Sequence, residues 1–134
     1  MDIKKAIPIG IESYKEIIDR DYYYIDKTRL IVDLLTQKSK VTLFTRPRRF
    51  GKTLAQSMLR TFFEEEIDSD GKAVDNSGYF AGKKIMGAGV QYTEHMGKYP
   101  VIFLSMKSAK QPDFEMAYDS LLDEIIREYD RHRY

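Results

Sequence analysis

Residues 41–63, VTLFTRPRRFGKTLAQSMLRTFF, carry the pattern that decides the expected fold. The first five, VTLFT at 41–45, form a short apolar run that is typical of a buried strand. A basic loop, RPRRFG at 46–51, comes next. Apolar residues then return at helical spacing, at Leu54, Met58, Leu59, Phe62 and Phe63. A strand, a tight loop ending in Gly-Lys-Thr and a helix together favour a phosphate-binding loop.

The chemistry of such a loop follows from the start of a helix. Its first backbone N–H groups have no partner within the helix, and the helix dipole adds positive charge at the same end, so the site attracts phosphate. Gly51 can adopt a backbone conformation that is closed to other residues. Lys52 can reach the β- and γ-phosphates of ATP, and the Thr53 hydroxyl can bind Mg²⁺.

The loop departs from the general pattern G-x-x-x-x-G-K-[ST] at its first glycine, which is replaced by Arg46. Pro47 restricts its own backbone and favours an extended Arg46. A basic turn in front of an ordinary helix therefore remains an alternative to a phosphate site.

The composition limits the class of protein. A length of 134 residues suits one domain or part of one, and 43% hydrophobic residues can form a globular core. With 22 basic and 21 acidic residues the formal net charge is +1, whereas proteins that coat nucleic acid are usually strongly basic. The chain has no cysteine, which excludes disulfides and cysteine metal sites. It has no apolar run of membrane-spanning or signal length, so we expect a cytoplasmic protein with no membrane partner.

The residues before the loop predict two helices. Ser13 is placed to cap a short helix over 14–19, with Glu16 completing a capping box. Asp26 is placed to cap a helix over roughly 27–37, whose apolar stripe comprises Leu30, Ile31, Leu34 and Leu35. The three tyrosines at 22–24 are expected to fill the core rather than to stack on a base.

The residues after the loop helix predict an irregular connection, a second strand and a long helix. Residues 66–100 contain six glycines and are expected to hold short helical pieces at most, with a solvated turn at 68–71. Residues 101–105, VIFLS, are a second apolar run, expected to be a buried parallel strand. A helix from Pro112 to about residue 131 follows, with an apolar stripe expected in the core: Phe114, Tyr118, Leu121, Leu122, Ile125, Ile126 and Tyr129.

This order of elements predicts an α/β fold, namely a partial P-loop NTPase fold with a short parallel sheet flanked by helices. We divide the single domain, 1–134, into a helical lead-in (1–40), a strand, loop and helix (41–65), an irregular connection (66–100), and a strand and helix (101–131). His95 and His132 are expected at the surface with no acidic partner.

Four stretches together resemble the AAA-ATPase-like family of P-loop proteins. They are IPIG at 7–10, YYIDKT at 23–28, TRPRRFGKT at 45–53 and YPVIFLS at 99–105. The resemblance spans almost the whole chain, and RPRRFGKT at 46–53 is its most specific part. An arginine at the first-glycine position is usual in that family, so Arg46 departs only from the general motif.

The resemblance implies an ATP- and Mg²⁺-binding domain of the AAA/STAND type. Its nucleotide-binding residues would be Arg46, Pro47, Arg48, Arg49, Phe50, Gly51, Lys52, Thr53 and Leu54, with Thr53 also binding the metal. In related ATPases the region of Asp26 and Lys27 approaches the adenine, although a helix cap is the simpler role for Asp26.

Members of the family are longer than this chain. They carry a later strand ending in the Walker B carboxylates, and many end in a restriction-endonuclease-like domain, which is a possible route to nucleic acid. We therefore expect this chain to be an N-terminal portion whose longer parent is an ATPase and which does not hydrolyse ATP by itself. The alternatives are a nucleic-acid-binding module that uses the basic loop and a structural interaction module with a degenerate loop. The sequence does not predict the oligomeric state.

Overall fold

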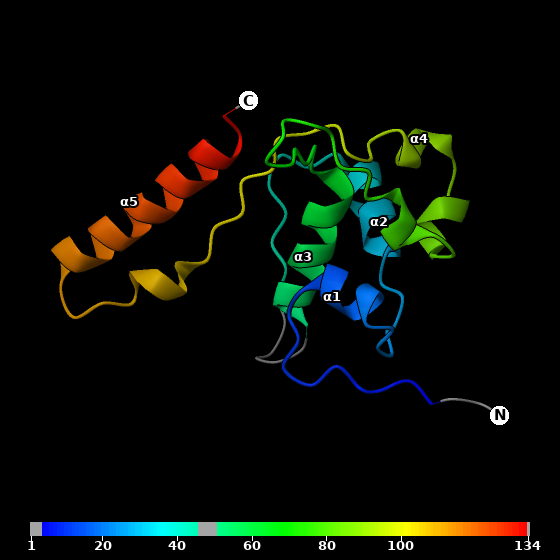
Figure 1. Cartoon of the computed structure of the whole chain (residues 1–134), viewed down its shortest axis with the longest axis horizontal. Helices are drawn as coiled ribbons and strands as arrows, with labels where there is room; N and C mark the ends of the chain where they lie inside the picture. Colours follow the sequence, from blue (N-terminus) through cyan, green and yellow to red (C-terminus); the bar gives the residue numbers. More distant parts are fainter. Residues whose placement is uncertain (1–3, 46–50, 134) are drawn as a thin grey trace.

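The computed structural model describes residues 4–45 and 51–133, in which every regular element is helical (Figure 1). The α-helices are α1 (Tyr14–Asp19), α2 (Arg29–Gln37), α3 (Lys52–Phe63), α4 (Val90–Thr93) and α5 (Phe114–Arg131). Short 3₁₀ helices are η1 (Ser77–Phe80), η2 (Lys84–Gly87) and η3 (Met106–Ala109). None of the helices in this part of the chain has the length and apolar character needed to cross a membrane.

Local sequence signals explain where the helices begin. The Ser13 side chain accepts a hydrogen bond from the backbone N–H of Glu16 at 3.4 Å, which confirms the predicted cap of α1. The side chain of Asp113 caps α5 in the same way, accepting from the Met116 N–H at 2.9 Å. Helix α3 also begins and ends as its apolar spacing predicts, whereas α2 begins two residues later than expected.

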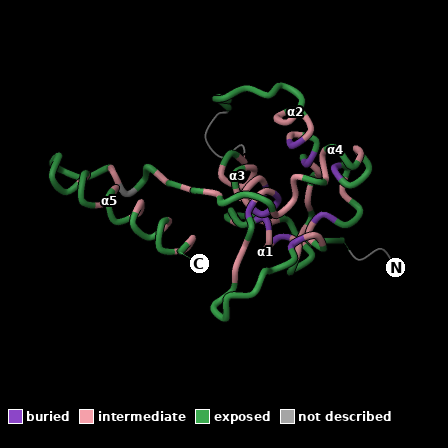
Figure 2. The backbone as a smooth tube through the Cα atoms, turned by 90° about the horizontal axis from the view of Figure 1, so that it is seen from above, coloured by how far each residue is buried: buried purple, intermediate pink, exposed green. Residues whose placement is uncertain are grey.

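The hydrophobic core lies between α1, α2, α3 and the two short helices η1 and η2 (Figures 1 and 2). Its fully buried side chains include Tyr14 of α1, Ile31 of α2, Phe62 of α3, Phe80 of η1 and Ile85 of η2. The rings of Tyr14 and Phe80 stack at 5.2 Å, and Phe62 meets Phe80 edge-on at 5.2 Å. Part of the irregular connection therefore supplies core residues and does not merely link other elements.

The predicted parallel sheet is wrong for the described residues, which contain no β-strand. Residues 41–45 and 101–105 are non-helical but form no ladder with each other, and Val41 and Leu43 are 86% and 84% exposed. Two isolated bridges are present instead, between Glu64 and Tyr99 and between Ile67 and Ala73. An apolar run shows that a segment favours burial, but a strand also needs a neighbour that completes its backbone hydrogen bonds. Neither run has such a neighbour here.

The predicted burial of the α5 stripe is also wrong. The helix forms, beginning two residues after Pro112, but it lies to one side of the other helices and approaches them only at its C-terminal end (Figure 1); none of its described residues is buried. Phe114 is 80% exposed and Tyr129 67% exposed. The stripe predicts an apolar face correctly. Helix η3 packs against α5, and Leu121 and Ile125 are half-buried, but without the expected sheet most of the face stays exposed.

Candidate functional site

The N-terminus of α3 has the backbone geometry that the loop motif predicts. Gly51 is the residue before the helix and has φ 79° and ψ 22°, a left-handed conformation that favours glycine. Its carbonyl accepts a hydrogen bond from Ala55 N–H at 2.9 Å, the first turn of α3. Lys52 and Thr53 are the first two residues of the helix, so their backbone N–H groups face outward from its positive end.

Of the remaining predicted site residues, the structure describes only Leu54. Leu54 is partly buried and packs against the hydrophobic core, so its side chain has a structural role. Arg46, Pro47, Arg48, Arg49 and Phe50 lie outside the described residues, and their predicted phosphate contacts stay predictions.

A basic cavity of about 360 Å³ lies beside the start of α3. Lys27, Arg29 and Lys52 bring three positive charges to its lining, and Asp33 brings one negative charge. Apolar side chains contribute the larger part of its lining, including Leu30, Phe44 and Leu59. Excess positive charge in a concave site attracts anions because the field is concentrated there.

An apolar cavity of about 340 Å³ lies on the other side of the same turn. Its lining comes mainly from the lead-in and the first turn of α3: Ile7, Pro8, Ile17, Tyr23, Tyr24, Ile25 and Leu54. Lys27, Gly51 and Ala55 line both cavities. The tyrosines at 23 and 24 therefore border a cavity, and Tyr23 is exposed rather than in the core as predicted.

Two hydrogen bonds fix residues 26–28 to η2, and two more join Asp26 to Thr28 within the segment. One carboxylate oxygen of Asp26 accepts from the Thr28 N–H at 2.9 Å and from its hydroxyl at 2.6 Å. The other accepts from the Lys84 N–H at 2.8 Å, and the Thr28 hydroxyl oxygen accepts from the Ile85 N–H at 3.1 Å. Asp26 therefore anchors a segment and does not cap α2, whose preceding residue, Thr28, makes no side-chain cap bond.

These bonds determine the charge state of Asp26. Partial burial alone would raise its pKa, but hydrogen bonds from Thr28 and the Lys84 N–H, together with the Lys83 charge, hold the pKa of Asp26 below its usual value. The carboxylate is thus ionised at neutral pH and accepts all three bonds.

The donor set around Gly51 fits a phosphate-bearing ligand better than it fits a metal by itself. Free helix N–H groups and unmatched cations are the partners that phosphate oxygens accept from. For Mg²⁺ the described site offers the Thr53 hydroxyl, and no cluster of three or more His, Cys, Asp or Glu side chains occurs anywhere in the described residues. A magnesium ion would therefore depend on oxygens from the nucleotide and water.

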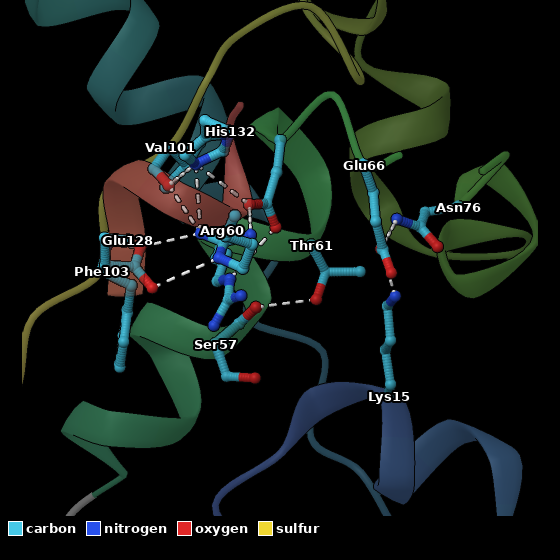
Figure 3. Close-up of polar contacts among 12 residues, drawn as sticks. Lys15, Ser57, Arg60, Thr61, Glu66, Asn76, Val101, Phe103, Glu128 and His132 are labelled. Carbon is cyan, nitrogen blue, oxygen red and sulfur yellow. Dashed lines mark hydrogen bonds and ion pairs between the residues drawn. The ribbon is translucent and has the colours of Figure 1, made fainter. Parts of the chain in front are cut away.

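The opposite end of α3 holds a charge network that the sequence did not predict (Figure 3). The Glu64 carboxylate, whose side chain is 4% exposed, accepts from Arg60 at 3.1 Å and from Arg131 at the end of α5. Arg131 also binds Glu128 at 2.8 Å, and His132 Nε2 lies 3.6 Å from Glu64. The prediction that His132 is a surface residue without an acidic partner is therefore wrong.

This network ties the last turn of α5 to the last turn of α3. A cavity of about 300 Å³ adjoins it, lined by Lys15, Arg60, Glu64 and Glu66 among others. Within the run Glu64-Glu65-Glu66 the sequence gives no signal as to which carboxylate is buried. The other histidine, His95, contacts the Tyr99 hydroxyl at 2.6 Å and has Glu94 at 3.9 Å, so it is not isolated either.

Comparison with known proteins gives a family and a relative that matches part of the chain. A family model described as a predicted AAA-ATPase matches residues 8–134. A stretch of 61 residues is 43% identical to a protein of Azotobacter chroococcum mcd 1 named "Uncharacterized protein in vnfD 5'region". That stretch is 45% of this chain and 12% of the relative, so the chain matches a small part of a longer protein. No solved structure matches.

Proposed function

This chain belongs to the predicted AAA-ATPase family, and we therefore propose that it binds ATP with Mg²⁺ at the N-terminus of α3. Membership of the family, which the resemblance of the four stretches predicted, indicates nucleotide use in general. The choice of ATP rests on the family resemblance, and the proposed position of its parts rests on the geometry around Gly51.

The observation that carries the proposal is the pair of cavities that meet at Gly51. A nucleotide has a flat apolar base at one end and a polyanion at the other. The apolar cavity suits the base, with Tyr23 and Ile25 in its lining, and the basic cavity suits the phosphates. Lys27, Gly51 and Ala55 line both cavities, which supports the proposal that one ligand spans the turn between them.

The residues of the loop have distinct roles in this proposal. The N–H groups at the start of α3 donate to phosphate oxygens, and the Lys52 ammonium neutralises their charge. The Thr53 hydroxyl is the ligand that the chain supplies to Mg²⁺, and Arg46, Arg48 and Arg49 are further phosphate partners. The proposal is for binding: by the family resemblance, the Walker B carboxylates that would assist hydrolysis belong to a later strand.

The test is binding of Mg-ATP to the native chain and to Lys52→Ala, with Lys72→Ala as the matched control. Lys72 is an exposed lysine that lines none of the cavities described above. At a hundred times the dissociation constant, ATP should add about 2.7 kcal/mol to the free energy of unfolding and raise the melting temperature by several degrees. The native chain and Lys72→Ala should show this rise, and Lys52→Ala should not.

Two results would overturn the proposal. One is the absence of any ATP-dependent rise in the native chain, and the other is an equal rise in Lys52→Ala. DNA binding that weakens steeply with salt and is indifferent to ATP would instead support the nucleic-acid alternative.

A further inference from the structure

Lys27 lies at the centre of the proposed nucleotide site although it belongs to the lead-in segment. A side-chain carbon added at Gly51 would be 3.9 Å from the Lys27 Nζ atom. Lys27 also lines both the basic and the apolar cavity. Its ammonium is therefore close to the turn where α3 begins, about 25 residues away in the sequence.

The Lys27 ammonium has no carboxylate partner in the described chain. The hydrogen bonds of Lys27 come from its backbone. Its N–H donates to the Tyr24 hydroxyl at 3.5 Å, and its carbonyl accepts from the Leu30 N–H at 3.1 Å. Asp33 lines the same cavity but forms no ion pair with it, while Arg29 and Lys52 bring further positive charge. Clustered like charges repel, and a polyanion placed among them relieves that repulsion.

The backbone of Lys27 is held in place from both sides. Asp26 is bonded to the Lys84 N–H, and Thr28 is fully buried and bonded to the Ile85 N–H. The lysine stem therefore starts from a fixed point, which lowers the conformational cost of binding. These two hydrogen bonds position Lys27 without using its side chain.

We infer that Lys27 is a second phosphate-binding cation of the nucleotide site, acting with Lys52 from outside the RPRRFGKT loop. The inference rests on the proposed function and names its ligand class: nucleotides that carry a polyphosphate. Lys27 donates to phosphate oxygens at the border of the two cavities. It therefore distinguishes ATP and ADP from the uncharged nucleoside and does not determine which base binds.

The experiment is calorimetric titration of the native chain, Lys27→Met, Lys27→Arg and Lys52→Ala with Mg-ATP, ADP and adenosine. Lys27→Met retains the apolar stem and removes the charge, whereas Lys27→Arg retains the charge. Lys72→Met is the matched control for loss of a lysine charge elsewhere. Because the Lys27 side chain is exposed, we expect each unliganded variant to melt within about a degree of the native chain.

We expect Lys27→Met to weaken ATP binding by about tenfold, to weaken ADP binding as well, and to leave adenosine binding unchanged. Lys27→Arg should restore most of the ATP affinity, and Lys72→Met should match the native chain. The native chain should also lose ATP affinity with added salt more steeply than Lys27→Met does.

The outcomes separate the two proposals. If the native chain does not bind ATP, the proposed function fails and this inference fails with it. If ATP binds and Lys52→Ala abolishes binding, but Lys27→Met stays within twofold of the native affinity, the inference about Lys27 alone is overturned. It is also overturned if Lys27→Met weakens adenosine as much as ATP, because the side chain would then shape the apolar cavity.

Discussion

Replacing Thr28 with valine should destabilise the protein and loosen the segment that carries Lys27. Thr28 is fully buried, and its hydroxyl donates to Asp26 at 2.6 Å and accepts from the Ile85 N–H at 3.1 Å. Valine has nearly the same shape, so it leaves the packing intact and removes both bonds. The Ile85 N–H then remains buried without an acceptor.

The magnitude follows from those two losses. An unsatisfied buried N–H costs about 1–3 kcal/mol. The lost bond to Asp26 costs about 1 kcal/mol more, because that carboxylate is partly exposed and water can replace the hydroxyl. The total is about 3 kcal/mol, which for a chain of this length lowers the melting temperature by roughly 10 °C. Thr28→Ser is the control, since it retains the hydroxyl and loses one buried methyl group, at about 1 kcal/mol.

The assay is urea denaturation of the native chain and the two variants, followed by circular dichroism. We expect Thr28→Val to be less stable than Thr28→Ser by at least about 1.5 kcal/mol, with similar denaturant slopes. If the valine variant unfolds within 0.5 kcal/mol of the native chain, or if serine is as harmful as valine, the hydroxyl does not hold residues 26–28 on η2. The ATP affinity of Thr28→Val should also fall, because Lys27 would lose its fixed position.

The burial pattern and the low pKa of Glu66 lead to two further predictions. Phe80→Ala should lower the free energy of unfolding by about 3–5 kcal/mol, because Phe80 is fully buried. Leu122→Ala, on the exposed face of α5, should lower it by less than about 1 kcal/mol. Equal losses in urea denaturation would mean that the α5 face is buried in solution. Partial burial would raise the pKa of Glu66, but hydrogen bonds from Lys15 and Asn76 hold it below its usual value. The ionised carboxylate therefore stabilises the fold at pH values above the unfolded pKa of about 4.3. That stabilisation is lost as the pH falls through the lower pKa of the folded state. Glu66→Gln should therefore reduce stability most at pH 7 and least near pH 3, and a pH-independent difference would contradict the ionised pairing.

Local signals in the sequence predicted the helices and the turn of the candidate site. Ser13 caps α1 through a bond to the residue three positions ahead, and the left-handed Gly51 starts α3. These features depend on neighbours within one turn, so the sequence specifies them without knowledge of the rest of the fold. The family was also predicted, because its motifs are short and linear.

Contacts between distant segments were not predicted. The connection 66–100 has no helical or strand period, yet it places Phe80 and Ile85 in the core. The run at 64–66 gives no sign that Glu64 is the carboxylate that meets Arg131 across the fold. Charge pairs of this kind depend on which segments come together, and no local pattern encodes that.

The sequence by itself determined the family, the longer helices and the glycine turn at Gly51, because each depends on neighbouring residues. The tertiary structure alone decided that the apolar runs at 41–45 and 101–105 form no sheet, and that the α5 face stays exposed. It also decided that Lys27 lies beside Gly51. Hydrogen-bond ladders, burial and the approach of distant charges all require a partner segment, and only the folded chain shows whether that partner is present.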